Sequence, residues 1–154
     1  MTPPVGRGNN WHTIDVFRKR PALRIERLNS ESLAKHRASI YSQLVVVEGG
    51  GRTVYVAGQV SRDARGETVG VGDVTAQTEQ VVANLRLALA TVHADLKDLV
   101  KVTVYTTDLR HLPLIDAVRR RHFVDSLPVS TLLEVRKLSK SEYLVEIDGI
   151  AVIP

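Results

Sequence analysis

The stretch DVTAQTEQVVANLRLALATVHADLKDLVKVTVY, residues 73–105, places a helical pattern directly before a strand pattern. Asp73 is suited to an N-cap, and apolar side chains follow it at helical spacing as far as Val92. Val100, Val102 and Val104 then alternate with polar residues, which is typical of a strand with one buried face. We therefore expect an amphipathic helix packed on a sheet.

The flanking sequence extends this pattern in both directions. A second helix is expected from about Leu112 to Asp125, with Pro113 in its first turn, and Pro128 ends it. Strands are expected at 23–27, 43–47, 52–57, 129–135 and 143–153, and the glycines at 49–51 suggest a hairpin between the second and third of these. The order predicts one α+β domain over residues 23–154, a mixed sheet of about six strands with two helices on one face.

The last expected strand has a bearing on assembly. Its odd-numbered positions are apolar and suit a face covered by the helices, yet three of its five even-numbered positions, Leu144, Ile150 and Val152, are apolar as well. A sheet face open to water alternates more cleanly. Because one chain has no further helices for the second face, we expect sister subunits to cover it.

Composition and charge exclude several classes of protein. The 154 residues include no Cys, so disulfides, thiolate metal sites and a cysteine nucleophile are excluded. No stretch approaches the roughly 20 apolar residues of a membrane span, and the first ten residues do not have the pattern of a secretory signal. These features predict a cytoplasmic protein without a membrane partner. The histidines have no metal-ligand spacing, and we expect neither a metal nor a cofactor.

The basic charge lies at the N-terminus. Six basic and two acidic side chains within residues 1–27 account for the whole net charge of +4. We interpret residues 1–22 as a flexible basic extension, and the run Arg119-Arg120-Arg121-His122 as a solvated helix face. A charge-neutral body argues against a nucleic-acid partner.

Six short motifs, in this order, resemble the reactive-intermediate deaminase family (RidA, formerly YjgF), whose members are also called endoribonuclease L-PSP-like. The resemblance covers about residues 23–153. The motifs are Tyr41-Ser42-Gln43, VYVAGQV (54–60), QTEQVVANL (77–85), VKVTVYTTD (100–108), PVST (128–131) and VEIDGIAV (145–152).

The resemblance implies a chorismate-mutase-like fold and a homotrimer. In such trimers the sheets close into a central β-barrel, with small-molecule clefts between adjacent subunits. The best-studied members hydrolyse 2-imino and 2-enamino acids to a 2-keto acid and ammonia without a cofactor. Some relatives have been described as endoribonucleases or translation inhibitors.

Site residues follow from the same resemblance. The carboxylate that activates or orients the hydrolytic water corresponds to Glu146, and the tyrosine near the cleft to Tyr41. The turn lining the cleft corresponds to Ala57-Gly58-Gln59, and a family asparagine in the second helix is Asp116 here.

The chain departs from the family two residues after Pro128, where active deaminases have an arginine that binds the substrate carboxylate. This chain has Ser130. Serine lacks the planar fork of a guanidinium, so ordinary 2-imino acids should bind about 30-fold to several-thousand-fold more weakly. If the last two strands pair around Leu138, Ser130 and Glu146 become near neighbours in one cleft.

Three hypotheses remain open from the sequence. The first is an imine or enamine hydrolase of altered specificity that uses Glu146 and the cleft at Ser130. The second is a non-catalytic small-molecule-binding or regulatory trimer, and the third is an RNA-directed activity. Purely structural roles also stay open, since Glu146 could form an intersubunit ion pair and Tyr41 could be a packed aromatic. An arginine of an adjacent chain could replace the missing one.

Overall fold

The computed structural model describes residues 21–33 and 40–154. The expected extension over residues 1–22 lies almost entirely outside the described residues. The elements in chain order are β1 (Arg24–Leu28), β2 (Leu44–Glu48), β3 (Arg52–Val60), α1 (Val74–Ala90), the 3-10 turn η1 (Leu96–Asp98), β4 (Leu99–Thr106), the 3-10 turn η2 (Leu109–His111), α2 (Leu112–His122), β5 (Val129–Glu134) and β6 (Val145–Ile153).

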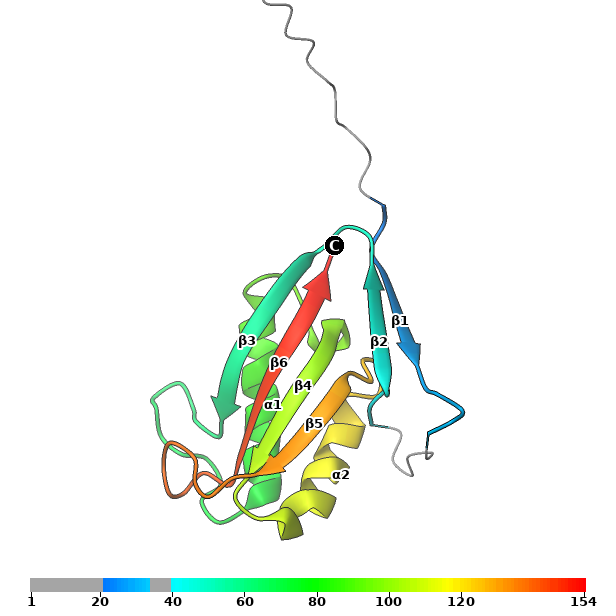
Figure 1. Ribbon diagram of the computed structural model, residues 1–154. Helices are drawn as coiled ribbons and strands as arrows, with labels where there is room; N and C mark the ends of the chain where they lie inside the picture. The colour runs from blue at the N-terminus through cyan, green and yellow to red at the C-terminus, as the bar shows by residue number, and fades with distance from the viewer. Residues whose placement is uncertain (1–20, 34–39) are drawn as a thin grey trace, which may run out of the picture.

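The strands form two sheets, not the single mixed sheet that we expected. Four strands pair in the order β3-β6-β4-β5, and β1 pairs with β2 in a separate antiparallel ladder. In the larger sheet β4 and β5 are parallel, whereas β6 is antiparallel to both of its neighbours. Figure 1 shows both helices behind this sheet, as the sequence predicted, and the β1–β2 ladder beside it.

The predicted hairpin between β2 and β3 is wrong. The chain between them is held at the start of β1, because the Gly50 N–H donates to the Pro21 carbonyl at 2.8 Å. Gly49 adopts φ +89°, and a Cβ built there would lie 2.2 Å from the Ala22 carbonyl oxygen. Only glycine allows this turn and this close approach. The two strands therefore diverge, and β2 pairs with β1 while β3 pairs with β6.

The core lies between the four-stranded sheet and the helices. Asp73 caps α1 as expected, since its carboxylate accepts hydrogen bonds from the backbone N–H groups of Thr75 (2.9 Å) and Ala76 (3.0 Å). The odd-numbered residues of β6 face the helices and are buried, as predicted. Buried side chains of the core include Val81, Val82, Leu85, Leu89, Val102, Val104, Ile115, Val118, Phe123, Val145 and Ile147.

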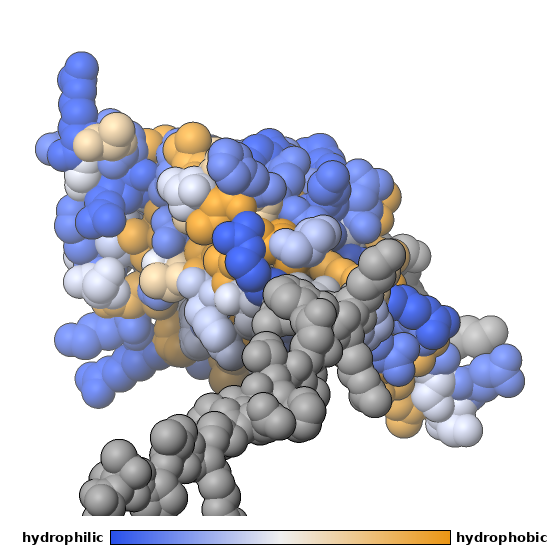
Figure 2. Space-filling model, turned by 90° about the horizontal axis from the view of Figure 1, so that it is seen from above, coloured by the Kyte–Doolittle hydropathy of each residue, from blue (hydrophilic) through white to orange (hydrophobic). Residues whose placement is uncertain are grey.

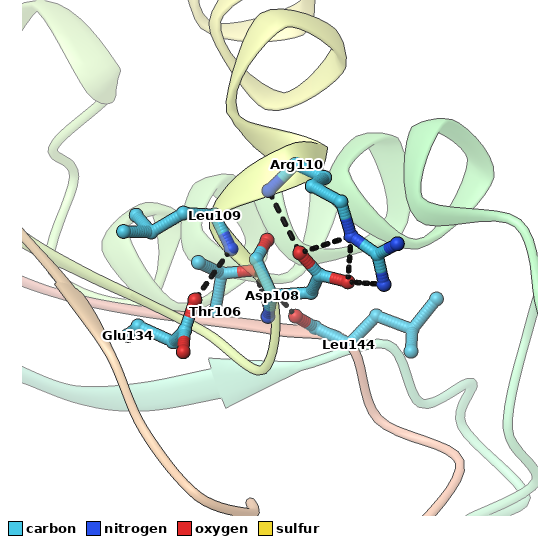
Figure 3. A network of polar contacts seen from close by, with 6 residues as sticks. All are labelled: Thr106, Asp108, Leu109, Arg110, Glu134 and Leu144. Atoms are coloured by element: carbon cyan, nitrogen blue, oxygen red, sulfur yellow. Dashed lines mark hydrogen bonds and ion pairs between the residues drawn. The ribbon is translucent and has the colours of Figure 1, made fainter.

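The link between β4 and α2 is fixed by a polar network (Figure 3). Asp108 accepts from the backbone N–H of Arg110 at 2.8 Å and from its Nε at 2.7 Å. The hydrogen bonds from the Arg110 side chain, and then from its backbone, lower the pKa of Asp108 to about 2. Glu134 accepts from the Leu109 N–H at 2.8 Å, which ties the link to β5. Asp108 thereby caps η2, which leads directly into α2.

The sheet has a second face that no helix of the described residues covers (Figure 1). It carries the even-numbered residues of β6 and the exposed Tyr55 of β3. Exposed apolar side chains also lie on β2, namely Leu44, Val46 and Val47. Seen from above, hydrophobic residues gather in the middle of the molecule, with hydrophilic residues around them (Figure 2). We call the uncovered side of the four-stranded sheet the open face.

Candidate functional site

Glu146 lies on the open face, close against the backbone of Gly58. It pairs with Val60 of β3 on one side and with Tyr105 of β4 on the other. A Cβ built on Gly58 would lie only 1.9 Å from Oε1 of Glu146, so the carboxylate occupies space that any other residue would fill. The glycine at position 58 therefore allows the Glu146 carboxylate to lie where it does.

A break in the β3 ladder shapes the strand next to Glu146. The register between β3 and β6 shifts between Val56 and Gln59, so Ala57 and Gly58 form an irregular step. The side-chain amide of Gln59 donates to the Ala57 carbonyl at 3.0 Å, which stabilises this step. The structure therefore brings together four of the predicted site residues, Ala57, Gly58, Gln59 and Glu146.

Two carboxylates stand near each other on the open face, and we call Glu146 and Asp148 the carboxylate pair. Partial burial, and then the charge of Asp148, raise the pKa of Glu146 above its ordinary value. Asp148 accepts a hydrogen bond from the Tyr105 hydroxyl at 2.9 Å. The arrangement suits a proton acceptor at Glu146 beside an anchored anion at Asp148.

A second polar group lies on the other side of the sheet, between β5 and α2. The Arg119 guanidinium donates from Nη2 to Ser130 Oγ at 2.7 Å and from Nη1 to Asp116 Oδ1 at 3.0 Å. The Arg119 side chain is 3% exposed and that of Asp116 is 18% exposed. Burial lowers the pKa of Arg119, whereas the nearby Asp116 carboxylate raises it.

Tyr41 completes this second group. The backbone N–H of Ser42 donates to the Leu127 carbonyl at 3.1 Å, which fixes the segment before β2 against the chain that leads into β5. Burial raises the pKa of the Tyr41 phenol; the Arg119 charge acts against that shift and the Asp116 charge adds to it. The phenol is therefore close to both charges. We call Tyr41, Asp116, Arg119 and Ser130 the Arg119 cluster.

The expectation that Ser130 and Glu146 are near neighbours is wrong for one protomer. The last two strands do not pair, because β4 lies between β5 and β6. Ser130 pairs with Val102, whose side chain is buried under the helices, whereas Glu146 pairs with Tyr105 on the open face. Because neighbouring residues of a strand point to opposite faces, the two groups lie on opposite sides of the sheet.

Arg119 is the residue that the sequence analysis missed. We expected residues 119–122 to form a solvated helix face, but Arg119 is 2% exposed. It follows Ile115 by four residues and Asp116 by three, so it lies on the buried side of α2 with an acidic partner one turn earlier. This spacing was the available signal. The prediction remains correct for Arg120 and Arg121, which are exposed.

The part of the chain that the structure describes contains no group of three His, Asp or Glu side chains arranged to hold a metal ion. None of the helices within residues 21–33 and 40–154 combines the length and the apolar character needed to cross a membrane.

Comparison with known proteins identifies the family. The family model described as Endoribonuclease L-PSP matches residues 33–153. The chain belongs to this family, the RidA/YjgF family. A RutC family protein of Pyrococcus abyssi is 36% identical over 111 residues, which cover 72% of this chain and 84% of the relative. The 2-iminobutanoate/2-iminopropanoate deaminase of Rattus norvegicus is 30% identical over 128 residues, which cover 83% of this chain and 90% of the relative.

A solved structure supports the same fold. The crystal structure of YyfB from Yersinia pestis, a protein of unknown function in the conserved Rid family, superposes with a TM-score of 0.77 at 30% identity. The match covers 84% of this chain and 98% of that chain. The predicted RidA/YjgF membership and its α+β fold are confirmed.

Proposed function

We propose that this RidA/YjgF protein is a cofactor-free hydrolase that deaminates imine or enamine intermediates, with Glu146 as its proton acceptor. The observation that carries the proposal is the Glu146 carboxylate on the open face, seated against Gly58 with a raised pKa. Relatives at about 30% identity are named 2-iminobutanoate/2-iminopropanoate deaminases, which supports imine hydrolysis as the family-level activity.

The chemistry demands little of the protein, because a protonated imine carbon is already electrophilic. Water attacks this carbon, and its oxygen forms the new C–O bond while Glu146 takes one of its protons. The proton then passes to the nitrogen of the carbinolamine. The C–N bond breaks while Glu146 takes the remaining hydroxyl proton, and ammonia leaves together with a keto product. A positioned water and one carboxylate are sufficient for these steps.

We propose further that the reaction site lies between copies of the chain in a homotrimer. Glu146 shares the open face with exposed apolar side chains such as Tyr55, which is 78% exposed. The two-stranded β1–β2 ladder also carries exposed apolar residues, and isolated two-stranded ladders are marginal in water. A trimer that buries these surfaces would place the carboxylate pair of one copy in a cleft against its neighbour.

Ser130 gives the proposed enzyme a substrate range different from that of relatives with arginine at this position. The hydroxyl of Ser130 cannot replace the two parallel N–H groups with which an arginine at this position of β5 would bind a carboxylate. The alternative function is a non-catalytic small-molecule-binding or regulatory trimer, and the change to Ser130 is the feature that favours it. An RNA-directed activity is not supported, because residues 28–154 carry no net charge.

The test is turnover of imines generated in situ by an amino-acid oxidase, measured as keto-acid formation above the uncatalysed rate. We expect Glu146→Gln to lower kcat at least about 100-fold. Glu67→Gln, which alters an exposed carboxylate, is the matched control and should keep full activity. A wild type that accelerates no imine in the panel would refute the enzyme and leave ligand binding as the function.

A further inference from the structure

The buried guanidinium of Arg119 has one unusual feature, an incomplete set of hydrogen bonds. Its Nε is fully buried and has no hydrogen-bond partner among the described residues. Nη1 donates to Asp116, Nη2 donates to Ser130, and the Phe123 ring lies with its centroid 6.0 Å from Cζ. Buried N–H groups in proteins are nearly always paired, so this vacancy calls for a ligand or a function.

The edge of the guanidinium that bears the vacancy faces Ser130. Nε and Nη2 donate in parallel from one edge of the planar group, which is the geometry that matches a carboxylate bidentately. At present this edge makes only one bond, to the neutral hydroxyl of Ser130. Asp116 is bonded to the other terminal nitrogen, Nη1, and so leaves the edge free of a competing anion.

We propose that Arg119 binds the carboxylate of the substrate through its Nε and Nη2 groups, in place of the Ser130 hydroxyl that now accepts from Nη2. The inference rests on the proposed function and names the residue that would recognise the substrate carboxylate in place of the arginine that Ser130 replaces. Asp116 positions the guanidinium, and Tyr41 lies close to both. The cation that binds the carboxylate then lies on helix α2, whereas an arginine at the position of Ser130 would lie on strand β5.

Arg119 is a good candidate for anion recognition because its charge is held in a dry site. Its side chain is 3% exposed, so attraction to a carboxylate is weakly screened there. Asp116 offsets the desolvation of the cation in the absence of ligand. Arg120, the next residue of α2, is exposed and provides a matched control on the same helix.

The experiment measures binding and not turnover, with 2-oxobutanoate, a 2-keto acid, as the probe in calorimetry. Arg119→Met should weaken its affinity at least about 30-fold, whereas Arg120→Met should leave the affinity unchanged. The uncharged 2-oxobutanamide should bind wild type and Arg119→Met equally weakly. Arg119→Lys should also bind 2-oxobutanoate poorly, because an ammonium lacks the fork.

Two further variants control for misfolding. The pair Arg119→Met with Asp116→Asn removes both buried charges and should fold yet still fail to bind 2-oxobutanoate. The pair Arg119→Met with Ser130→Arg moves the guanidinium from α2 to β5 and should restore binding. No 2-oxobutanoate binding by wild type, or equal binding by a folded Arg119→Met protein, would overturn the inference.

The outcomes separate this inference from the proposed function. Arg119-dependent binding of 2-oxobutanoate without any imine hydrolysis would refute the hydrolase and support the carboxylate site. Full imine turnover by Arg119→Met at low substrate concentration would support the hydrolase and refute the role of Arg119.

Discussion

The carboxylate pair and the Arg119 cluster lie on opposite faces of one sheet and have opposite physical character. Glu146 and Asp148 are partly exposed, and partial burial, followed by the charge of Asp148, raises the pKa of Glu146. Arg119 is a buried cation that Asp116 neutralises. Under the proposed function, one face would handle water and the other would recognise an anion. One small substrate cannot reach both groups within a single protomer.

The largest expected effect comes from breaking the charge balance of the Arg119 cluster. Asp116→Asn leaves Arg119 buried beside a neutral amide, which should lower the free energy of unfolding by about 3 kcal/mol. Urea unfolding at fixed protein concentration measures the loss. Adding Arg119→Met should recover most of it. A loss no larger than that of the exposed control Arg120→Met would show that the pair is not buried as described.

Within the carboxylate pair, the position of Glu146 depends on the space that Gly58 leaves for its carboxylate. In Gly58→Ala the new Cβ would lie 1.9 Å from Oε1 and 2.8 Å from Cδ of Glu146, so the carboxylate must move. A displacement of about 1 Å costs on the order of 100-fold in rate, and we expect kcat to fall by this factor. The thermal midpoint should change little, because the displaced group is the flexible end of a side chain. Unchanged turnover would exclude Glu146 as the proton acceptor.

The pH profile distinguishes the two causes of the raised Glu146 pKa. Burial is the larger cause and the Asp148 charge is the second. Asp148→Asn removes that charge, so the pKa of Glu146 should fall. Because a proton acceptor works deprotonated, the acid limb of kcat/KM should then move to lower pH.

Tyr105→Phe is the control for this shift, since it removes the hydroxyl that donates to Asp148 but keeps the Asp148 charge. Its acid limb should not move to lower pH. An acid limb that stays in place in Asp148→Asn would assign the titration to another group.

Local patterns in the sequence predicted the elements well, whereas their pairing depended on contacts between distant segments. The cap at Asp73 and the alternation along β4 and β6 are properties of short stretches, and the structure confirms them. The β2–β3 hairpin failed because the glycine turn is held by Pro21 and Ala22, which belong to another part of the chain.

The candidate site shows the same limit. The order strand, helix, strand across β4, α2 and β5 favours a parallel pair, which the structure shows, but this order alone does not place β6 on the far side of β4. From the sequence we expected that the final two strands could pair. Arg119 belongs to a run of basic residues, and only its spacing from Ile115 and Asp116 distinguished it from the exposed arginines that follow.

The central claim is that recognition by Arg119 and catalysis by Glu146 meet only between copies of the chain. The direct test mixes two variants, Arg119→Met and Glu146→Gln, under conditions that allow subunits to exchange, and measures imine hydrolysis at low substrate concentration. If each site takes Arg119 from one copy and Glu146 from another, about a quarter of the sites in an equal mixture regain both residues, and activity should return to that level. Activity no higher than the average of the two separate variants would contradict the claim.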